Sequence, residues 1–230
     1  MKPAAAAVTT GDPAHRPGWR PRLGPAVSRH RGDLIVSVVA VAVLVLSALP
    51  VPANRVSGPE RSVFHWVNNG VAVPFVIVWP VMQLGNIIVV PVAAAVALAA
   101  RRVRLAASIL VGGALVYELA KVVKRLVVRG RPSALLPDVH IHGAAAQGLG
   151  YVSGHAGVVA LLLTVAVPYL GRRVQWVVGI LAAAVCLARL YVGAHLPLDV
   201  VGGAALGVAV GAGMRLVFGR PAPCRPTTRC

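Results

Sequence analysis

The sequence predicts an all-α integral membrane protein, a bundle of about six transmembrane helices with both termini on the cytoplasmic side. Hydrophobic residues make up 57 % of the 230 residues and charged residues only 13 %. A soluble domain is about 45–50 % apolar and about 25 % charged. Long apolar runs recur along the chain, and most basic residues lie between or beside these runs. The length suits one compact bundle without a second domain.

The first apolar run, from Leu34 to Val51, is interpreted as a retained transmembrane helix. The alternative is a signal peptide with Val51-Pro52-Ala53 as its cleavage site. The basic region ahead of the run is long for a signal peptide, whose apolar core usually spans about 7–15 residues. Residues 1–33 are rich in Pro, Gly, Ala and Arg and lack apolar periodicity. We therefore expect a disordered basic cytoplasmic tail there.

The uncharged stretch from Val71 to Ala100 is too long for one straight crossing. As a single helix it would measure about 45 Å, against a hydrocarbon core of about 30 Å. We expect an outer interfacial segment over about 64–83, anchored by Trp66 and Trp79, and then a span over about 84–100. The candidate breaks are Pro74, Pro80 and the pair Gly85-Asn86.

Four further spans are predicted, over about 105–123, 155–170, 174–191 and 197–218. The last is rich in glycine, and small residues let helix backbones approach closely inside a membrane. The glycines expected at such contacts are Gly202, Gly203, Gly207, Gly211 and Gly213. These boundaries give a membrane domain at 34–218 and a short cytoplasmic tail at 219–230.

The formal net charge of +17 indicates membrane topology rather than nucleic-acid binding. With six spans, the two basic tails and the basic loops at 101–104 and 172–173 fall on one side. The positive-inside rule makes that side cytoplasmic. No groove-reading or base-stacking pattern accompanies these charges, so no nucleic-acid partner is expected.

One predicted outer loop breaks the charge rule. The stretch KVVKRLVVRGRP, from Lys121 to Pro132, is strongly basic, and an anionic ligand would explain positive charge on the outer side. Neighbouring span ends add four ionisable residues to the same face. These are His155, Arg189, His195 and Asp199. Ionisable residues at membrane depth are costly and usually functional.

The spacing of these residues has three parts: Lys124-x6-Arg131-Pro132, Ser153-Gly154-His155, and Arg189-x5-His195-x3-Asp199. It resembles the signature of the type 2 phosphatidic acid phosphatase superfamily, which includes lipid phosphatases, undecaprenyl diphosphate phosphatases and vanadium haloperoxidases. The resemblance covers roughly residues 34–218. Two positions depart from the usual pattern. Val152 stands in place of a proline, and Ala188 stands in place of a serine.

The predicted phosphate-binding residues are Lys124, Arg131, Ser153, Gly154 and Arg189. Phosphoryl transfer depends mainly on positioning and charge stabilisation. Arginine offers a planar fork to phosphate oxygens, and lysine offers a point charge. Ser153 suits a helix N-cap, which would direct the first N–H groups of the helix at an anion. Gly154 leaves room for close approach of the backbone.

Three residues are predicted to be catalytic. The resemblance implies that His195 is a nucleophile that forms a phosphohistidine. Pro197 favours a helix start just after it, so Asp199 in the first turn can reach back to one imidazole nitrogen and leave the other free to attack. His155 would protonate the leaving group and later activate water.

Neither a metal nor another cofactor is expected. The chain has only six acidic residues, and a two-metal phosphatase needs several convergent carboxylates. Glu118 lies one helical turn from Lys121, so we interpret it as half of a structural ion pair.

The function expected from these features is that of a membrane lipid phosphatase. It would hydrolyse a polyprenyl diphosphate or phosphatidic acid type of lipid at the outer face of a bacterial plasma membrane. Two alternatives use the same residues: a lipid-linked phosphotransferase, and a non-catalytic protein that binds anionic lipid. A vanadate-dependent peroxidase is disfavoured because those relatives are soluble. The loop over 133–150 either closes over the head group or is an ordinary flexible loop.

Overall fold

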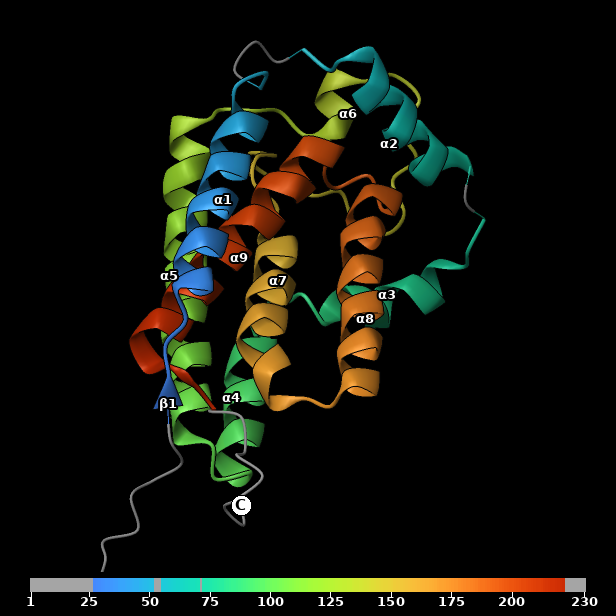
Figure 1. Cartoon of the computed structure of the whole chain (residues 1–230). Coiled ribbons are helices and arrows are strands. Elements are labelled where there is room, and N and C mark those ends of the chain that lie inside the picture. The colour runs from blue at the N-terminus through green and yellow to red at the C-terminus, as the bar shows by residue number, and fades with distance from the viewer. Residues whose placement is uncertain (1–26, 52–54, 71, 222–230) are drawn as a thin grey trace, which may run out of the picture.

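The computed structural model describes residues 27–51, 55–70 and 72–221, which form a helical bundle with one pair of very short strands (Figure 1). The predicted N-terminal tail and the end of the C-terminal tail therefore lie largely outside the described residues. The helices are α1 (Arg31–Ala48), α2 (Gly58–Gly70), α3 (Phe75–Gln83), α4 (Val89–Ala99), α5 (Val103–Leu126), α6 (Pro132–Leu135), α7 (Gly154–Ala166), the 3₁₀ helix η1 (Val167–Tyr169), α8 (Arg172–Tyr191) and α9 (Pro197–Phe218). The strands are β1 (Val27–Ser28) and β2 (Arg220–Pro221).

The predicted all-α membrane architecture is confirmed in its coarse form. Among the described residues, four helices, α1, α5, α8 and α9, are long and apolar enough to cross a membrane. Two shorter apolar helices, α4 and α7 with η1, occupy the second and fourth predicted spans. The first helix begins at Arg31, three residues before the predicted start at Leu34.

The long uncharged stretch divides at two of its three predicted breaks. Pro74 is the N-cap of α3, and Gly85-Asn86 lies in the turn between α3 and α4, where Asn86 Oδ1 accepts a hydrogen bond from the Ile88 N–H. Pro80 lies inside α3, so the prediction of a break there is wrong. Because the turn uses residues 84–88, α4 covers less than the predicted span at 84–100.

The segment predicted to be interfacial forms two helices, α2 and α3, which both pack on α8. Asn68 anchors α2, because its buried amide donates to the carbonyl oxygens of Tyr191 at 2.7 Å and of His140 at 2.8 Å. The two predicted anchors, Trp66 and Trp79, are exposed.

Helix α9 packs against both α1 and α7, and its contact with the α7 segment runs through glycine. A Cβ atom added at Gly203 would lie 2.2 Å from the Ser153 carbonyl oxygen, and one added at Gly207 would lie 2.2 Å from the Gly157 carbonyl oxygen. Gly211 also lies close to α7, at Thr164, so three of the five predicted glycines are at the helix contact, whereas Gly202 meets the ring of Tyr151 instead. The prediction is wrong for Gly213, which faces open space.

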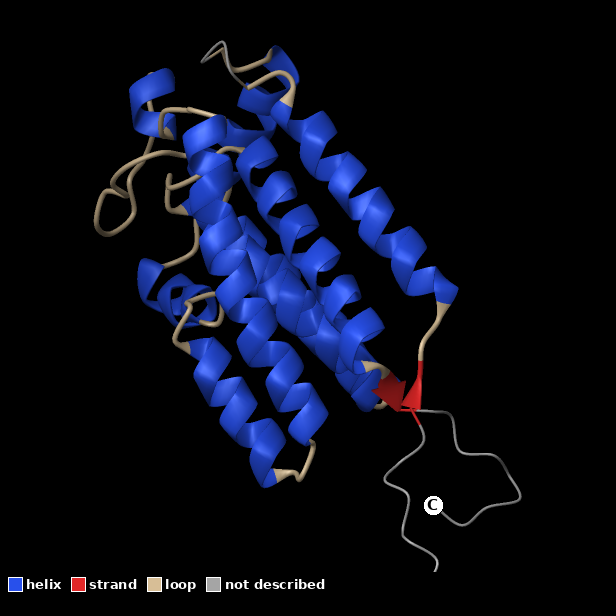
Figure 2. Ribbon diagram, turned by 90° about the vertical axis from the view of Figure 1, so that its left-hand side faces the viewer, coloured by secondary structure: helices blue, strands red, loops and turns tan. Residues whose placement is uncertain are grey.

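One end of the bundle collects the termini of the described chain and the basic loops (Figures 1 and 2). Strand β1 pairs with β2, and the buried carboxylate of Asp33 forms ion pairs with Arg220 at 2.7 Å and Arg215 at 3.4 Å. Arg102 donates to the Tyr169 carbonyl oxygen, so the two basic loops meet there as well. We call this the basic end of the bundle. Helices α2 and α6 lie at the opposite end.

The close contact between α7 and α9 predicts different effects for two glycines of the same helix. Gly207→Ala should destabilise the fold by about 1–3 kcal/mol or more, because its methyl group would overlap a backbone carbonyl. Gly213→Ala is the matched control. It should be neutral or stabilising by up to about 1 kcal/mol, because alanine favours helix over glycine. Thermal unfolding of both variants in detergent tests this, and equal unfolding temperatures would contradict it.

Candidate active site

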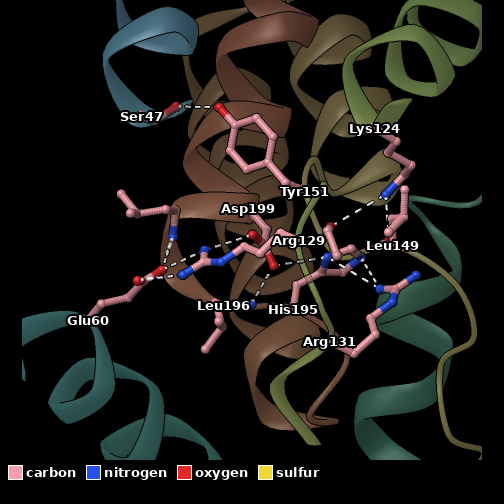
Figure 3. A network of polar contacts seen from close by, with 12 residues as sticks. Ser47, Glu60, Lys124, Arg129, Arg131, Leu149, Tyr151, His195, Leu196 and Asp199 are labelled. Carbon is pink, nitrogen blue, oxygen red and sulfur yellow. Dashed lines mark hydrogen bonds and ion pairs between the residues drawn. The ribbon is translucent and has the colours of Figure 1, made fainter. Parts of the chain in front are cut away.

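The candidate site residues come from five helices and one loop that meet in the bundle; Figure 3 shows Lys124, Arg131, His195 and Asp199 among them. His195 lies in the loop between α8 and α9, and Asp199 in the first turn of α9. The remaining residues lie in the last turns of α5 and α8, at the start of α6, and at the start of α7. These are Lys124, Arg189, Arg131, Ser153, Gly154 and His155.

The His195 loop is held by the end of α8. The Arg189 carbonyl oxygen accepts the N–H groups of Ala194 at 3.1 Å and His195 at 3.2 Å, after a turn in which Gly193 has a φ of +71°. Glycine adopts this left-handed conformation without the steric cost that other residues meet. The chain therefore turns sharply at the end of α8 and buries His195, which is only 3 % exposed.

Asp199 sits beneath the imidazole. Pro197 begins α9, and the Asp199 Oδ2 atom accepts the Leu196 N–H at 2.8 Å, which caps the helix start. The same oxygen lies 3.6 Å from His195 Nδ1. The i to i+4 spacing thus places the carboxylate on one side of the ring and leaves Nε2 on the other.

The imidazole of His195 is neutral at ordinary pH. Burial lowers its pKa to about 3, although the Asp199 carboxylate acts in the opposite direction. A neutral imidazole carries a proton on one nitrogen and a lone pair on the other. A proton on Nδ1 facing Asp199 would leave the Nε2 lone pair available as a nucleophile.

Arg131 lies directly against this nitrogen. Its Nη1 atom is 3.0 Å from His195 Nε2 and donates to the Ala194 carbonyl oxygen at 2.7 Å. Two further donations, to Gln147 and Gly148 carbonyl oxygens, fix the other edge of the guanidinium. Burial lowers the pKa of Arg131, but the guanidinium of an arginine in a protein stays protonated.

Lys124 and Arg189 add positive charge around the same point. Lys124 Nζ donates to the Leu149 carbonyl oxygen at 3.0 Å. Arg189 is 9 % exposed, its Nη1 contacts Met82 Sδ at 2.8 Å, and its buried Nε has no hydrogen-bond partner in the described part of the chain. Within the described ranges, Lys124, Arg131 and Arg189 form no ion pair with a carboxylate. Three cations without a counter-charge make a strong site for an anion.

The start of α7 faces this group of cations. Ser153 is buried and is the N-cap, with its hydroxyl accepting the Ala156 N–H at 3.5 Å, and its own N–H donates to the Asp199 carbonyl oxygen at 2.8 Å. The first N–H groups of a helix lack partners within it and attract anions. Gly154 and His155 occupy these positions, and both line a cavity of about 240 Å³ together with Lys124.

Arg129 and Glu60 are the residues that sequence reasoning did not assign to the site. The Arg129 side chain is fully buried, and it binds Glu60 at 2.7 Å and Asp199 at 2.9 Å. Arg129 was visible as part of the basic stretch before Pro132. Glu60 gave no signal, because an acidic residue far away in the sequence cannot be paired with a particular arginine from spacing alone.

Helix α5 ends at Leu126, and Pro132 begins α6 with Arg131 as its N-cap. Glu118 and Lys121 do form the expected ion pair, at 3.0 Å, on an exposed part of α5.

The fold and the site together define a class: a multi-pass membrane protein with a buried histidine–aspartate pair under a cluster of unpaired cations. Residues 101–223 match the family model described as the PAP2 superfamily. This chain belongs to that superfamily, so the family resemblance of the three motifs is confirmed.

Similarity to individual proteins agrees with this assignment. The chain is 30 % identical over 124 residues to an undecaprenyl-diphosphatase of Sulfolobus acidocaldarius, an alignment that covers 51 % of this chain and 57 % of that protein. The fold is similar to the crystal structure of Aquifex aeolicus LpxE, with a TM-score of 0.61, 22 % identity, and coverage of 66 % of this chain and 92 % of that one. It is also similar to a transmembrane PAP2 type phosphatidylglycerolphosphate phosphatase from Bacillus subtilis, with a TM-score of 0.60, 19 % identity, and coverage of 78 % and 94 %.

The buried neutral histidine predicts a specific pH dependence of stability. Unfolding restores an ordinary pKa of about 6.5 for the His195 imidazole. Below that pH the unfolded protein therefore binds a proton on this ring, whereas the folded protein does not. The contribution of His195 to the free energy of unfolding is fully present above pH 6.5. It is lost as the pH falls toward the pKa of the folded protein, about 3. Between pH 7 and pH 5 it amounts to about 2 kcal/mol.

We therefore expect the wild type to lose more stability than His195→Asn over this range, because asparagine does not titrate there. Denaturant unfolding in detergent at pH 7, 6 and 5 measures the difference. Parallel pH profiles for the two proteins would contradict the prediction.

Proposed function

We propose that this protein is a phosphatase that hydrolyses a phosphate or diphosphate ester of a membrane lipid through a phosphohistidine on His195. The observation that carries the proposal is the position of the His195 imidazole, between the Asp199 carboxylate at 3.6 Å from Nδ1 and the Arg131 guanidinium at 3.0 Å from Nε2. This arrangement suits a nucleophile on one side of the ring and a phosphate-binding cation at the attacking atom.

In the first step, the Nε2 lone pair attacks phosphorus and the bond from phosphorus to the leaving oxygen breaks. The leaving oxygen takes a proton from a protonated His155 and departs as an alcohol or a lipid monophosphate. The His195 ring acquires positive charge as the nitrogen–phosphorus bond forms. The Asp199 carboxylate stabilises that charge.

In the second step, water attacks the phosphorus of the phosphohistidine while His155 takes a proton from the water. The nitrogen–phosphorus bond breaks, its electrons return to Nε2, and inorganic phosphate leaves. Lys124, Arg131 and Arg189 hold the phosphate oxygens in both steps, together with the Gly154 and His155 N–H groups. This chemistry needs no metal or other cofactor.

The surroundings of the site support a lipid substrate. The cavity of about 240 Å³ begins at Lys124, Gly154 and His155 and continues over apolar side chains. These include Ile87, Val116, Ala120 and Val158. A head group held by the cations would therefore leave its hydrocarbon chain next to an apolar surface. An undecaprenyl-diphosphatase among the relatives makes polyprenyl diphosphate the first substrate to test, with phosphatidic acid as the second.

We further propose that residues 34–218 act as one membrane domain with six crossings, in which α4 and α7 with η1 are the two short ones. The basic end would face the cytoplasm by the positive-inside rule. Both termini would then be cytoplasmic, and the site would open to the periplasm or exterior of a bacterial cell.

The first experiment measures phosphate release from a C55-type polyprenyl diphosphate and from phosphatidic acid, in detergent with excess chelator. Wild type should release phosphate, and His195→Ala should reduce the rate by about 10³-fold or more, because the nucleophile is lost. His65→Ala is the matched control, since His65 lies on α2 and contacts Asn69. It should leave the rate unchanged.

Each other outcome has a definite meaning. Release that survives in His195→Ala would overturn the phosphohistidine mechanism. Release that appears only when a lipid or sugar acceptor is added would identify a phosphotransferase. An absence of both, with retained lipid binding, would identify a non-catalytic binding protein.

The cavity makes a separate prediction about the lipid chain. Ile87→Trp should raise the KM for a long-chain lipid phosphate about 10-fold, because the indole would fill the apolar part of the cavity, at a cost of about 1.4 kcal/mol in binding. Its neighbour Ile88 does not line the cavity and is 67 % exposed, so Ile88→Trp is the matched control. Both variants should hydrolyse p-nitrophenyl phosphate like wild type. Equal KM values for the lipid would contradict this assignment.

A further inference from the structure

Arg129 is as deeply buried as Asp199, and it does not line the cavity. The Arg129 side chain has no exposed surface, yet its guanidinium is shared between two carboxylates (Figure 3). Nη1 donates to Glu60 Oε1 at 3.0 Å and to Asp199 Oδ1 at 2.9 Å, and Nη2 donates to Glu60 Oε2 at 2.7 Å. Glu60 Oε1 also accepts the Leu198 N–H at 3.1 Å.

All three groups are charged. Burial lowers the pKa of Arg129, but the hydrogen bonds and charges of Glu60 and Asp199 outweigh burial and raise it. Glu60 and Asp199 each form an ion pair with the same guanidinium, at 2.7 Å and 2.9 Å. The group of Glu60, Arg129 and Asp199, which we call the buried triad, therefore carries a net charge of −1.

The net charge matters because Arg129 alone would cancel Asp199. His195 becomes positive when Nε2 bonds to phosphorus, and the nearby carboxylate is the group that stabilises this charge. An arginine at 2.9 Å from that carboxylate works against it. Glu60 lies on the far side of Arg129 and restores the missing negative charge. The triad can thus orient Asp199 rigidly without losing its electrostatic effect on His195.

Fold stability alone does not account for such an arrangement. Burying three charged groups costs several kcal/mol of desolvation for each ion, and replacing buried ion groups by apolar residues is often neutral or stabilising. Glu60 and Arg129 also have no place in the cavity lining or among the unpaired cations. Their contact with the reaction runs through Asp199.

We infer that Glu60 and Arg129 are positioning residues for the reaction: Arg129 fixes the Asp199 carboxylate under His195, and Glu60 supplies the negative charge that keeps this carboxylate effective. This inference rests on the proposed function. It assigns a role in turnover to α2, the helix that carries Glu60.

The decisive comparison is between Glu60→Gln and Glu60→Asp. Glutamine keeps the length and hydrogen-bonding capacity of the side chain but removes its charge, whereas aspartate keeps the charge and shortens the side chain. The inference predicts a kcat about 10- to 100-fold lower for Glu60→Gln, with KM within about twofold of wild type, because a charge effect of this size acts only in the transition state. Glu60→Asp should retain a kcat within about threefold of wild type. A purely structural role for Glu60 predicts the opposite order.

The double variant Glu60→Gln with Arg129→Gln provides a second test. Its triad again carries a net charge of −1, from Asp199 alone, although it has lost more hydrogen bonds than Glu60→Gln. We expect its kcat to exceed that of Glu60→Gln by about 10-fold. A kcat below that of Glu60→Gln would overturn the charge assignment.

Asp33→Asn is the matched control. It removes a carboxylate that is 1 % exposed and paired with two arginines, but at the basic end of the bundle. It should lower the unfolding temperature in detergent and leave kcat unchanged. A triad variant that has the same lowered unfolding temperature as Asp33→Asn and, like it, an unchanged kcat would contradict a role in turnover.

Binding of orthovanadate separates this inference from the proposed function, because it requires no turnover. Vanadate accepts a nitrogen ligand in a five-coordinate adduct that places the same positive charge on His195 as phosphoryl transfer does. Its dissociation constant, measured by ⁵¹V NMR or calorimetry, should rise about 10-fold in Glu60→Gln and recover in the double variant.

If vanadate affinity follows this order in a protein that hydrolyses no lipid, the proposed function is wrong, but the charge effect of Glu60 and Arg129 on His195 stands. If the wild type hydrolyses lipid and Glu60→Gln has unchanged kcat and vanadate affinity, the proposed function stands and the inference is wrong. A wild type that neither hydrolyses lipid nor binds vanadate would overturn both.

Discussion

The Asp199 carboxylate is the point on which the geometry of the site depends. The two carboxylate oxygens contact the Arg129 guanidinium, the Leu196 N–H and the His195 ring. The backbone carbonyl oxygen of Asp199 accepts a hydrogen bond from the Ser153 N–H. One residue therefore fixes the start of α9, the start of α7 and the imidazole relative to one another. A buried carboxylate needs this many partners, because each unsatisfied oxygen would cost free energy in an apolar interior. The same partners that stabilise Asp199 thus assemble the site.

The backbone contact between α7 and α9 is what brings Ser153 to Asp199. Helices in a membrane gain little from hydrophobic association, so close packing of small residues supplies much of their attraction. Gly203 and Gly207 allow two turns of α9 to lie directly on the carbonyl groups of α7. A side chain at either position would push the helix starts apart and lengthen the hydrogen bond from Ser153 to Asp199. Glycines inside the bundle therefore act on the geometry of charged residues at its end.

The features that could be predicted from the sequence are those set by local geometry. Hydropathy located the long apolar helices, and the spacing of His195, Pro197 and Asp199 within one helix start was enough to place the carboxylate near the ring. Three-dimensional packing decided the rest. Pro80 was tolerated inside α3, and Gly213 faces open space although its neighbours touch α7. The pairing of Glu60 with Arg129 joins residues far apart in the sequence, and no periodicity links them.

The contrast between Arg129 and the three other cations explains how one basic segment can serve two purposes. Arg129 lies two residues before Arg131, yet Arg129 is bound to two carboxylates, whereas Arg131 contacts backbone carbonyl oxygens and the imidazole. A carbonyl oxygen positions a guanidinium without cancelling its charge, so Arg131, like Lys124 beside the Leu149 carbonyl oxygen, stays available to a phosphate. The two carboxylates of the site, Glu60 and Asp199, bind Arg129. Among the residues that the structure describes, neither forms an ion pair with the cations that line or adjoin the cavity. The Asp199 carboxylate lies beside Nδ1 of the His195 ring, whereas Arg131 Nη1 is nearer to Nε2, at 3.0 Å, than to Nδ1, at 3.4 Å. The local charge therefore becomes more positive toward the nitrogen that we propose as the nucleophile, which suits attack on a phosphate.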